Sequence, residues 1–208
     1  MKLPTRRRLV LFAGVTAIAI AALAVSPPGR GVLFHVSPIR WTGEAPRLAA
    51  LLKLTPGMAV ADIGAGGGAM ALEIAATIGP AGRIFVTERT PEQRARLAER
   101  ATAHPHTVVI EALDDQTNLP DACCDAIYLR FVWHHLGNPE VYARSLARAL
   151  KPGGRLAIID FSPGAFFHLD ADHGVSADEV TRVMTSAGFT VEHRDDRWGR
   201  AFAVGFKR

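Results

Sequence analysis

From Trp41 to the C-terminus, apolar residues follow two spacings that alternate along the chain. A spacing typical of helices covers 45–54, 69–78, 140–150 and 177–187, and a further helix is predicted to begin at Pro91. Short apolar runs typical of strands lie between them, at 58–63, 83–88, 107–112, 126–131, 155–160, 189–194 and 201–206. This alternation predicts an α/β fold with a doubly wound, seven-stranded, mostly parallel sheet. The last two strands have no helix between them, so the C-terminal strand is expected to be antiparallel.

A different pattern precedes this domain. Three arginines, Arg6 to Arg8, are followed by an uncharged apolar run from Leu9 to Val25 and by a segment with three prolines. We interpret 1–25 as a signal peptide or an N-terminal membrane anchor, 26–40 as a linker and 41–208 as the folded domain. The sequence thus predicts membrane targeting, to a bacterial inner membrane or periplasm. It leaves open whether 1–25 is cleaved and on which side of the membrane the domain lies.

The net charge of +4 does not indicate a nucleic-acid partner, because the excess positive charge lies outside the folded domain. Residues 1–40 hold six basic groups and no acid, so 41–208 carry 18 basic against 20 acidic residues, or about −2. A domain without excess positive charge is not expected to bind nucleic acid. The only cysteines, Cys123 and Cys124, are neighbours with no further ligands at a suitable spacing, so neither a disulfide framework nor a metal site is expected.

A glycine-rich loop follows the strand at 58–63, where residues 60–76 read VADIGAGGGAMALEIAA. This loop fits two nucleotide-binding patterns: the dinucleotide fingerprint Gly64-x-Gly66-x-x-Ala69, and the S-adenosylmethionine (SAM) loop Asp62-x-Gly64-x-Gly66-x-Gly68. Both ligands need glycine, because the backbone must approach them closely and turn with positive φ. The loop alone does not separate the two ligands.

Three other features favour SAM. Asp62 lies where a dinucleotide would place its pyrophosphate, which a carboxylate repels, whereas the ammonium of a methionine group is attracted to it. Asp114 and Asp115 follow the third strand, within reach of an adenine amino group. The chain also ends in two paired strands instead of a further βαβ unit. Glu88, at the end of the second strand, suits ribose hydroxyls in either case.

Several segments in order resemble a class I SAM-dependent methyltransferase, which has a Rossmann-like fold. They span about residues 45–208 and read VADIGAGGG, VTE, LDDQTNLPDACCDAIYL, LKPGGRLAIID and AGFTVEH. FVWHHLGNPEVYARSLARALKPGG is similar to the small-molecule branch that includes ubiquinone/menaquinone-biosynthesis methyltransferases. The resemblance implies cofactor contacts at Asp62, Gly64, Gly66, Glu88, Asp115, Leu129 and Arg130. Gly68 completes the loop, and Asp114 is the alternative to Asp115.

Two adjacent histidines are the candidates for catalysis. His134 and His135 follow the fourth strand, at the rim where an acceptor would lie, and a histidine there can remove a proton from a hydroxyl group. The alternative is that one ring packs under the loop and bonds to backbone. The long segment that holds His168, Asp170 and His173 suggests a lid over an apolar acceptor.

Together these features predict a methyltransferase that moves a methyl group from SAM to a small-molecule or lipid-like acceptor by in-line displacement. Two alternatives stay open: a SAM-binding domain without catalysis, and a NAD(P)-linked oxidoreductase. The sequence identifies neither the acceptor nor the oligomeric state.

Overall fold

The computed structural model describes residues 43–102, 104–163, 174–198 and 201–208. The predicted targeting segment, 1–25, and the linker, 26–40, lie outside these residues, as do His168, Asp170 and His173 of the predicted lid. None of the described helices is long and apolar enough to cross a membrane. Membrane targeting therefore stays a prediction from the sequence.

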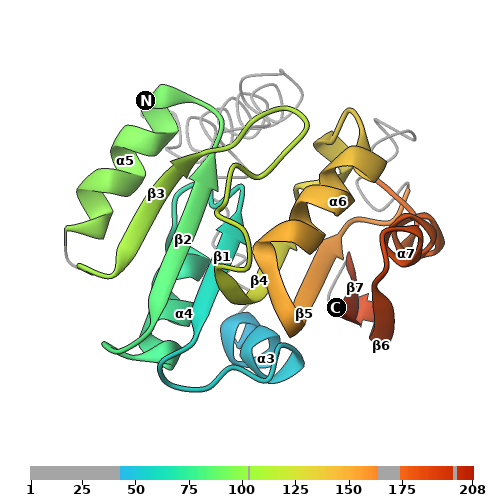
Figure 1. Cartoon of the computed structure of the whole chain (residues 1–208), viewed down its shortest axis with the longest axis horizontal. Helices are drawn as coiled ribbons and strands as arrows, with labels where there is room; N and C mark the ends of the chain where they lie inside the picture. The colour runs from blue at the N-terminus through green and yellow to red at the C-terminus, as the bar shows by residue number, and fades with distance from the viewer. Residues whose placement is uncertain (1–42, 103, 164–173, 199–200) are drawn as a thin grey trace, which may run out of the picture. The chain divides into compact units, whose positions relative to one another are not determined.

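The described residues form a seven-stranded sheet flanked by helices, in the strand order β3-β2-β1-β4-β5-β7-β6 (Figure 1). The strands are β1 Ala59–Ile63, β2 Arg83–Glu88, β3 Thr107–Glu111, β4 Cys124–Arg130, β5 Leu150–Asp160, β6 Thr190–Trp198 and β7 Ala201–Lys207. The helices are α3 Glu44–Leu51, α4 Ala69–Ile78, α5 Pro91–Ala101, α6 Pro139–Ala149 and α7 Ala177–Ser186, with a short 3₁₀ helix η1 at Trp133–His135. The predicted doubly wound, mostly parallel fold is confirmed.

Local signals fix where the helices begin. Thr90 caps α5, because its hydroxyl oxygen accepts the Gln93 amide at 3.3 Å and donates to the Gln93 side chain at 2.7 Å. Ser176 caps α7 in the same way, by accepting the Glu179 amide at 3.1 Å. Each cap satisfies a backbone donor that the first helical turn leaves without an intrahelical partner.

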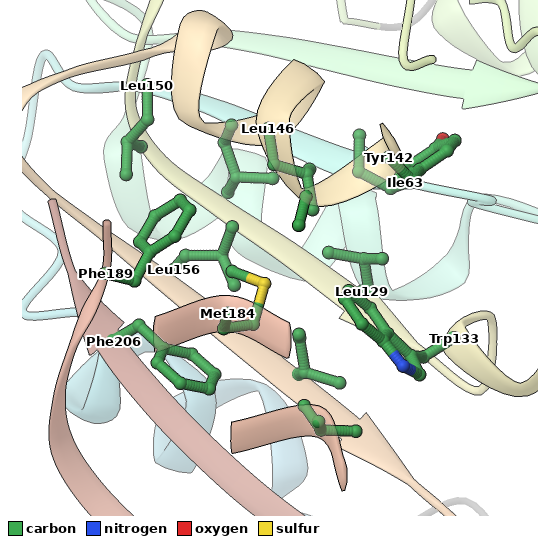
Figure 2. Packing of buried hydrophobic residues seen from close by; sticks show 14 of the residues in the cluster. Ile63, Leu129, Trp133, Tyr142, Leu146, Leu150, Leu156, Met184, Phe189 and Phe206 are labelled. Carbon is green, nitrogen blue, oxygen red and sulfur yellow. The ribbon is translucent and has the colours of Figure 1, made fainter. Parts of the chain in front are cut away.

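Two apolar cores lie on opposite faces of the sheet. One is formed with α6 and α7, and Figure 2 shows Met184 of α7 pointing toward Leu156 of β5. In the same core the rings of Phe189 and Phe206 meet edge to face, with centroids 6.2 Å apart. The other core is formed with α3, α4 and α5, and Figure 1 shows α4 and α6 on opposite sides of the sheet. Strands buried on both faces need continuous apolar runs, which is what their sequences show.

In the sheet, the last strand in the chain, β7, lies next to β5, and the strand before it in the chain, β6, lies outside β7. β7 pairs antiparallel with both β5 and β6, so it lies inside the sheet, and β6 forms the edge. The predicted antiparallel C-terminal strand is confirmed, and it lies one place inside the edge of the sheet. The reason is compositional: AFAVGF is buried along its length, whereas β6 carries charged side chains of both signs, most of them exposed. Charged side chains are tolerated on an edge strand and protect it from pairing with other chains.

Candidate cofactor and acceptor site

The candidate residues converge on one edge of the sheet. The parallel strands β1, β2, β4 and β5 end there, and a polar residue stands at or next to the end of each: Asp62, Glu88, Arg130 and Asp160. In an open α/β sheet, ligands bind outside the carboxyl ends of the strands, where the strand order reverses. In this sheet that point lies between β1 and β4, so the predicted Asp62 and Arg130 belong to the two strands that flank it.

The glycine loop between β1 and α4 turns in a conformation that favours glycine. Gly64 has φ 68°, and a Cβ atom there would lie 2.6 Å from Cγ2 of Val132, so alanine does not fit without a shift. Gly66 has φ 54°, and Gly68, with φ 74°, is the N-cap of α4. The predicted loop residues therefore lie together, in a turn where the absence of side chains lets a ligand approach the backbone closely.

Glu88 joins the second strand to this loop. Its side chain accepts the Gly66 amide at 2.6 Å through Oε1 and the Arg89 amide at 3.1 Å through Oε2. A carboxylate has about four acceptor positions, so these two bonds leave capacity for the ribose hydroxyls that the sequence assigns to it. The sequence did not predict the bond to Gly66. Through this bond, Glu88 also stabilises the glycine loop.

Asp62 is buried, with 3% of its surface exposed, on the side of the sheet that α3 and α4 cover. Burial raises the pKa of its carboxyl from 3.8 to about 7, while the Tyr128 hydroxyl and the Arg130 guanidinium lower it. A carboxylate with this raised pKa gains more than an exposed one from a cation placed beside it. This is the environment that an ammonium group of a ligand would stabilise.

Tyr128 lies opposite Asp62 on the neighbouring strand. Burial, together with the Asp62 carboxylate, raises the pKa of this phenol. Its hydroxyl is fully buried and interacts with the Asp62 carboxylate, but this contact does not meet the geometry of a hydrogen bond, and no other described residue completes it. A buried hydroxyl without a partner is costly unless a ligand or water completes it. With Asp62 and the glycine loop, it gives the edge a set of groups that fit the polar and cationic parts of SAM.

Arg130 is held by the first residue of α3. Its Nε lies 3.0 Å from both carboxylate oxygens of Glu44, and its Nη2 lies 2.9 Å from Oε2. Trp198 donates to the same carboxylate, from Nε1 to Oε1 at 3.1 Å. Leu129, which the resemblance paired with Arg130, is fully buried in the core on the other face. Neither Glu44 nor Trp198 was predicted as part of the site.

His134 forms a second buried pair, with Asp160 at the end of β5. Its Nδ1 lies 2.6 Å from Oδ1 of Asp160, and its backbone amide donates to Oδ2 at 3.1 Å. The side chain of His134 is 4% exposed and that of Asp160 is not exposed at all. The His135 ring packs against the His134 ring at 3.9 Å, and His135 is exposed. The structure thus distinguishes two histidines that the sequence presented as equals.

Aromatic side chains surround this pair. Phe131 stacks on Phe161 with ring centroids 4.0 Å apart, and the His134 ring lies 6.2 Å from Phe161. Phe131 also has φ 60°, an uncommon backbone conformation for a bulky residue. Such strain persists only where surrounding contacts enforce it, and it is frequent at functional sites.

An open pocket of about 540 Å³ lies beside Glu88, at the ends of β2 and β3. It is lined by Glu88, Arg89, Thr90, Pro91, Gln93, Glu111, Ala112, Leu113 and Asp114. Asp114 forms an ion pair with Arg89, and both side chains are largely exposed. Asp115, which the resemblance favoured over Asp114, is exposed and is not among the lining residues. The choice between the two aspartates stays a prediction.

Comparison with known proteins agrees with this geometry. Residues 61–158 match the family model described as a methyltransferase domain. The chain is 31% identical to the ubiquinone/menaquinone biosynthesis C-methyltransferase of Ectopseudomonas mendocina over 114 residues, 52% of this chain and 44% of the relative. It is 32% identical to the 27-O-demethylrifamycin SV methyltransferase of Amycolatopsis mediterranei over 165 residues, 72% of this chain and 60% of the relative. The chain thus spans about half the length of the curated relatives it matches.

The fold has a similar counterpart among solved structures. The crystal structure of a SAM-dependent methyltransferase from Aquifex aeolicus superposes with a TM-score of 0.72 at 23% identity, covering 79% of this chain and 89% of that one. These comparisons favour neither the NAD(P)-linked oxidoreductase nor the SAM-binding domain without catalysis. Residues 61–158 thus belong to the methyltransferase-domain family, the fold is that of the class I SAM-dependent methyltransferases, and the cofactor is SAM.

Proposed function

We propose that this protein methylates a hydroxyl oxygen of a small-molecule or lipid-like acceptor, with His134 as the general base. The observation that carries the proposal is the buried His134–Asp160 pair at the carboxyl ends of β4 and β5. In-line methyl transfer requires no covalent intermediate, so alignment of the reactants and removal of one proton are the tasks left to the protein.

The contact with Asp160 supports this role because it fixes the tautomer of the His134 imidazole. Asp160 accepts the Phe161 amide at 2.8 Å as well as the two bonds from His134, so its carboxylate acts as an acceptor in all of them. A carboxylate that accepts from Nδ1 places the basic lone pair of the imidazole on Nε2 and fixes the orientation of the ring. It also stabilises the imidazolium that forms when the ring takes a proton, as in other histidine–carboxylate pairs.

When bound, SAM supplies an electrophilic methyl group on a positively charged sulfur. His134 removes the proton as the acceptor oxygen forms its bond to the methyl carbon and the carbon–sulfur bond breaks. The products are a methyl ether, S-adenosylhomocysteine and a protonated His134, which then loses its proton to solvent. Phe131 and Phe161 would provide an apolar, aromatic surface next to this reaction.

The names of the relatives support two acceptor atoms. One relative is named for methylation at an oxygen and the other as a C-methyltransferase of quinone biosynthesis. Methylation of a ring carbon beside a phenol also begins with removal of the hydroxyl proton, so His134 would serve both reactions. The longer match is to the oxygen-methylating relative, and we therefore place O-methylation first.

The test is label transfer from methyl-labelled SAM by the full-length protein. The acceptors are a metabolite extract and a panel of a catechol, a naphthol and a hydroxyquinone, with products identified by mass spectrometry. His134→Gln should lower turnover by about 100-fold or more, with unchanged SAM affinity. His135→Gln is the matched control and should retain most activity. Equal turnover in the two variants, or label found only on nitrogen, would overturn the proposal.

A further inference from the structure

Two adjacent cysteines stand at the start of β4. Cys123 precedes the strand and Cys124 is its first residue, and their Sγ atoms lie 2.7 Å apart. Both are free thiols in this structure. The pair lies at the opposite end of β4 from Arg130, about 20 Å away at roughly 3.3 Å per residue along the strand. It therefore belongs neither to the cofactor site nor to the acceptor site.

The two thiols differ in exposure and in acidity. Cys123 is half-buried, whereas Cys124 is fully buried in the core formed with α6 and α7. The hydrogen bond with Cys124 lowers the pKa of the Cys123 thiol against the effect of burial, and the Lys151 ammonium adds to this lowering. The same hydrogen bond, together with burial, raises the pKa of Cys124. An accessible thiol of lowered pKa beside a second thiol is the arrangement of redox-sensitive cysteine pairs.

We propose that Cys123 and Cys124 are a site of reversible oxidation by low-molecular-weight disulfides, with Cys123 as the attacking thiol and Cys124 as the thiol that closes the bond. The inference goes beyond the proposed function and does not depend on it. It rests on the contact between the two sulfur atoms and on the difference in their burial.

The reaction follows from the order of the two thiols. The Cys123 thiolate attacks one sulfur of the small disulfide, whose S–S bond breaks and releases one thiolate. Cys124 gives its proton to that thiolate and attacks Sγ of Cys123. The second small thiolate leaves and takes up the proton that Cys123 lost to solvent. In total, two cysteine thiols lose two electrons and two protons, and the small disulfide becomes two thiols.

The backbone limits how stable this bond can be. Adjacent Cα atoms lie about 3.8 Å apart across a trans peptide, less than the roughly 4.4–6.8 Å that disulfides usually span. Closing the ring therefore twists the peptide between the cysteines. The pairing of β4 with β5 is already irregular here, with a register shift between Cys124 and Ala126. The bond can thus form without breaking a regular ladder, and its strain makes it easy to reduce.

Asp125, the next residue, links this end of β4 to both neighbouring strands. Its Oδ2 accepts the amide of Ala59, the first residue of β1, at 2.8 Å, and its Oδ1 lies 2.8 Å from Nζ of Lys151 in β5. A twist of the backbone beside Asp125 strains both contacts. Oxidation should therefore lower the midpoint of denaturant unfolding, and reduction should restore it.

The test treats the full-length protein with glutathione disulfide and follows its intact mass. The parent protein should lose two hydrogen atoms and keep no glutathione, and dithiothreitol should reverse the change. Cys124→Ser keeps a hydroxyl group that can donate to Cys123, so this variant should retain glutathione on Cys123. Cys123→Ser leaves only the buried Cys124, so it should react at least about tenfold more slowly and show no shift in its unfolding midpoint.

Alkylation of the parent protein with iodoacetamide, followed by peptide mapping, ranks the two thiols without any substitution. Cys123 should be labelled before Cys124, and this result stands even if a variant fails to fold. No change in mass, a lasting glutathione adduct on the parent protein, or equal reaction rates in Cys123→Ser and Cys124→Ser would overturn the inference. A higher unfolding midpoint after oxidation would also overturn it, because the bond would then be a structural one. None of these measurements involves SAM or an acceptor, so failure of the proposed function leaves them unchanged.

Discussion

The two ends of the candidate cofactor site use the same residue types in different surroundings. At the methionine end, Asp62, Tyr128 and Glu44 are buried between the sheet and the helices that cover it. At the adenosine end, the Asp114 side chain is 83% exposed and that of its partner Arg89 is 63% exposed. Asp62 is therefore buried and has a raised pKa, whereas the Asp114 carboxylate lies in solvent.

This difference teaches where selectivity for the cofactor resides. Opposite charges attract far more strongly when they are shielded from water, whereas an exposed ion pair is screened and contributes little. Burial makes the ionised form of Asp62 unfavourable until a cation compensates it. If SAM binds as the sequence predicts, the methionine end should discriminate by charge, and the adenosine end mainly by shape and by the two acceptor oxygens of Glu88.

The largest effect is expected at the most buried acid. Asp62→Asn removes the charge that faces the ligand ammonium, and SAM affinity should fall by about 100-fold at pH 8.

The parent protein should also show a pH dependence of SAM binding. Below pH 7, SAM must displace a proton from Asp62, so the affinity should fall about tenfold for each pH unit below that value and stay level above it. Calorimetric titrations between pH 5.5 and 8.5 measure both effects. A parallel pH dependence in Asp62→Asn would assign the titration to another group.

Asp62→Asn weakens SAM binding, but in the ligand-free protein the same substitution should increase stability against unfolding at neutral pH. The pKa of Asp62 is about 7 in the folded protein, above its ordinary value of 3.8, so its stabilising contribution is present below pH 4 and is lost as the pH rises to 7. The loss amounts to roughly 1.4 kcal/mol per pH unit across that range. Denaturant unfolding should therefore show Asp62→Asn gaining stability relative to the parent as the pH increases.

What the sequence revealed of this site follows from how local each signal is. The glycine loop, Asp62 and Glu88 were predicted because each lies at the end of its own strand, and the strand pattern places these ends on one edge. The pairs were not predicted: Glu44 and Arg130 are 86 residues apart, and His134 and Asp160 are 26 apart. Their contact depends on the strand order and on how α3 packs. Asp160 nevertheless carried a signal, since it ends the fifth strand as Glu88 ends the second.

The strand order itself shows the same limit. The sequence predicted two paired strands at the C-terminus but did not say which one contacts β5. The apolar composition of β7 against the charged β6 held that information, because only an apolar strand can be buried on both faces. The burial that each strand can tolerate therefore predicts its place in the sheet better than its order in the chain does.

An intermediate effect is expected at Glu88, which lies between the two ends. Glu88→Gln keeps an oxygen that can accept the Gly66 amide, so the loop should retain its support. It removes the negative charge that strengthens bonds to both ribose hydroxyls, and SAM affinity should fall about tenfold. Glu88→Ala also removes the loop contact and should bind more weakly still. Equal affinities in Gln and Ala would mean that the bond to Gly66 contributes nothing to binding, which would assign Glu88 to the ribose alone.

The smallest effect is expected at the exposed aspartates of the adenosine end. Asp114→Ala and Asp115→Ala each remove a carboxylate that water already solvates, so SAM affinity should change by less than about fivefold. The two variants also separate the alternatives: the aspartate that accepts from the adenine amino group should show a measurable loss of SAM affinity, and its neighbour none.

Arg89→Gln is the control for the ion pair, because it frees Asp114 without changing either acid. Adenosine, titrated alongside SAM, should report the same ranking, since it lacks the methionine end. A loss of fiftyfold or more at either aspartate would break the comparison, because it would mean that bound SAM buries a carboxylate that lies in water in its absence.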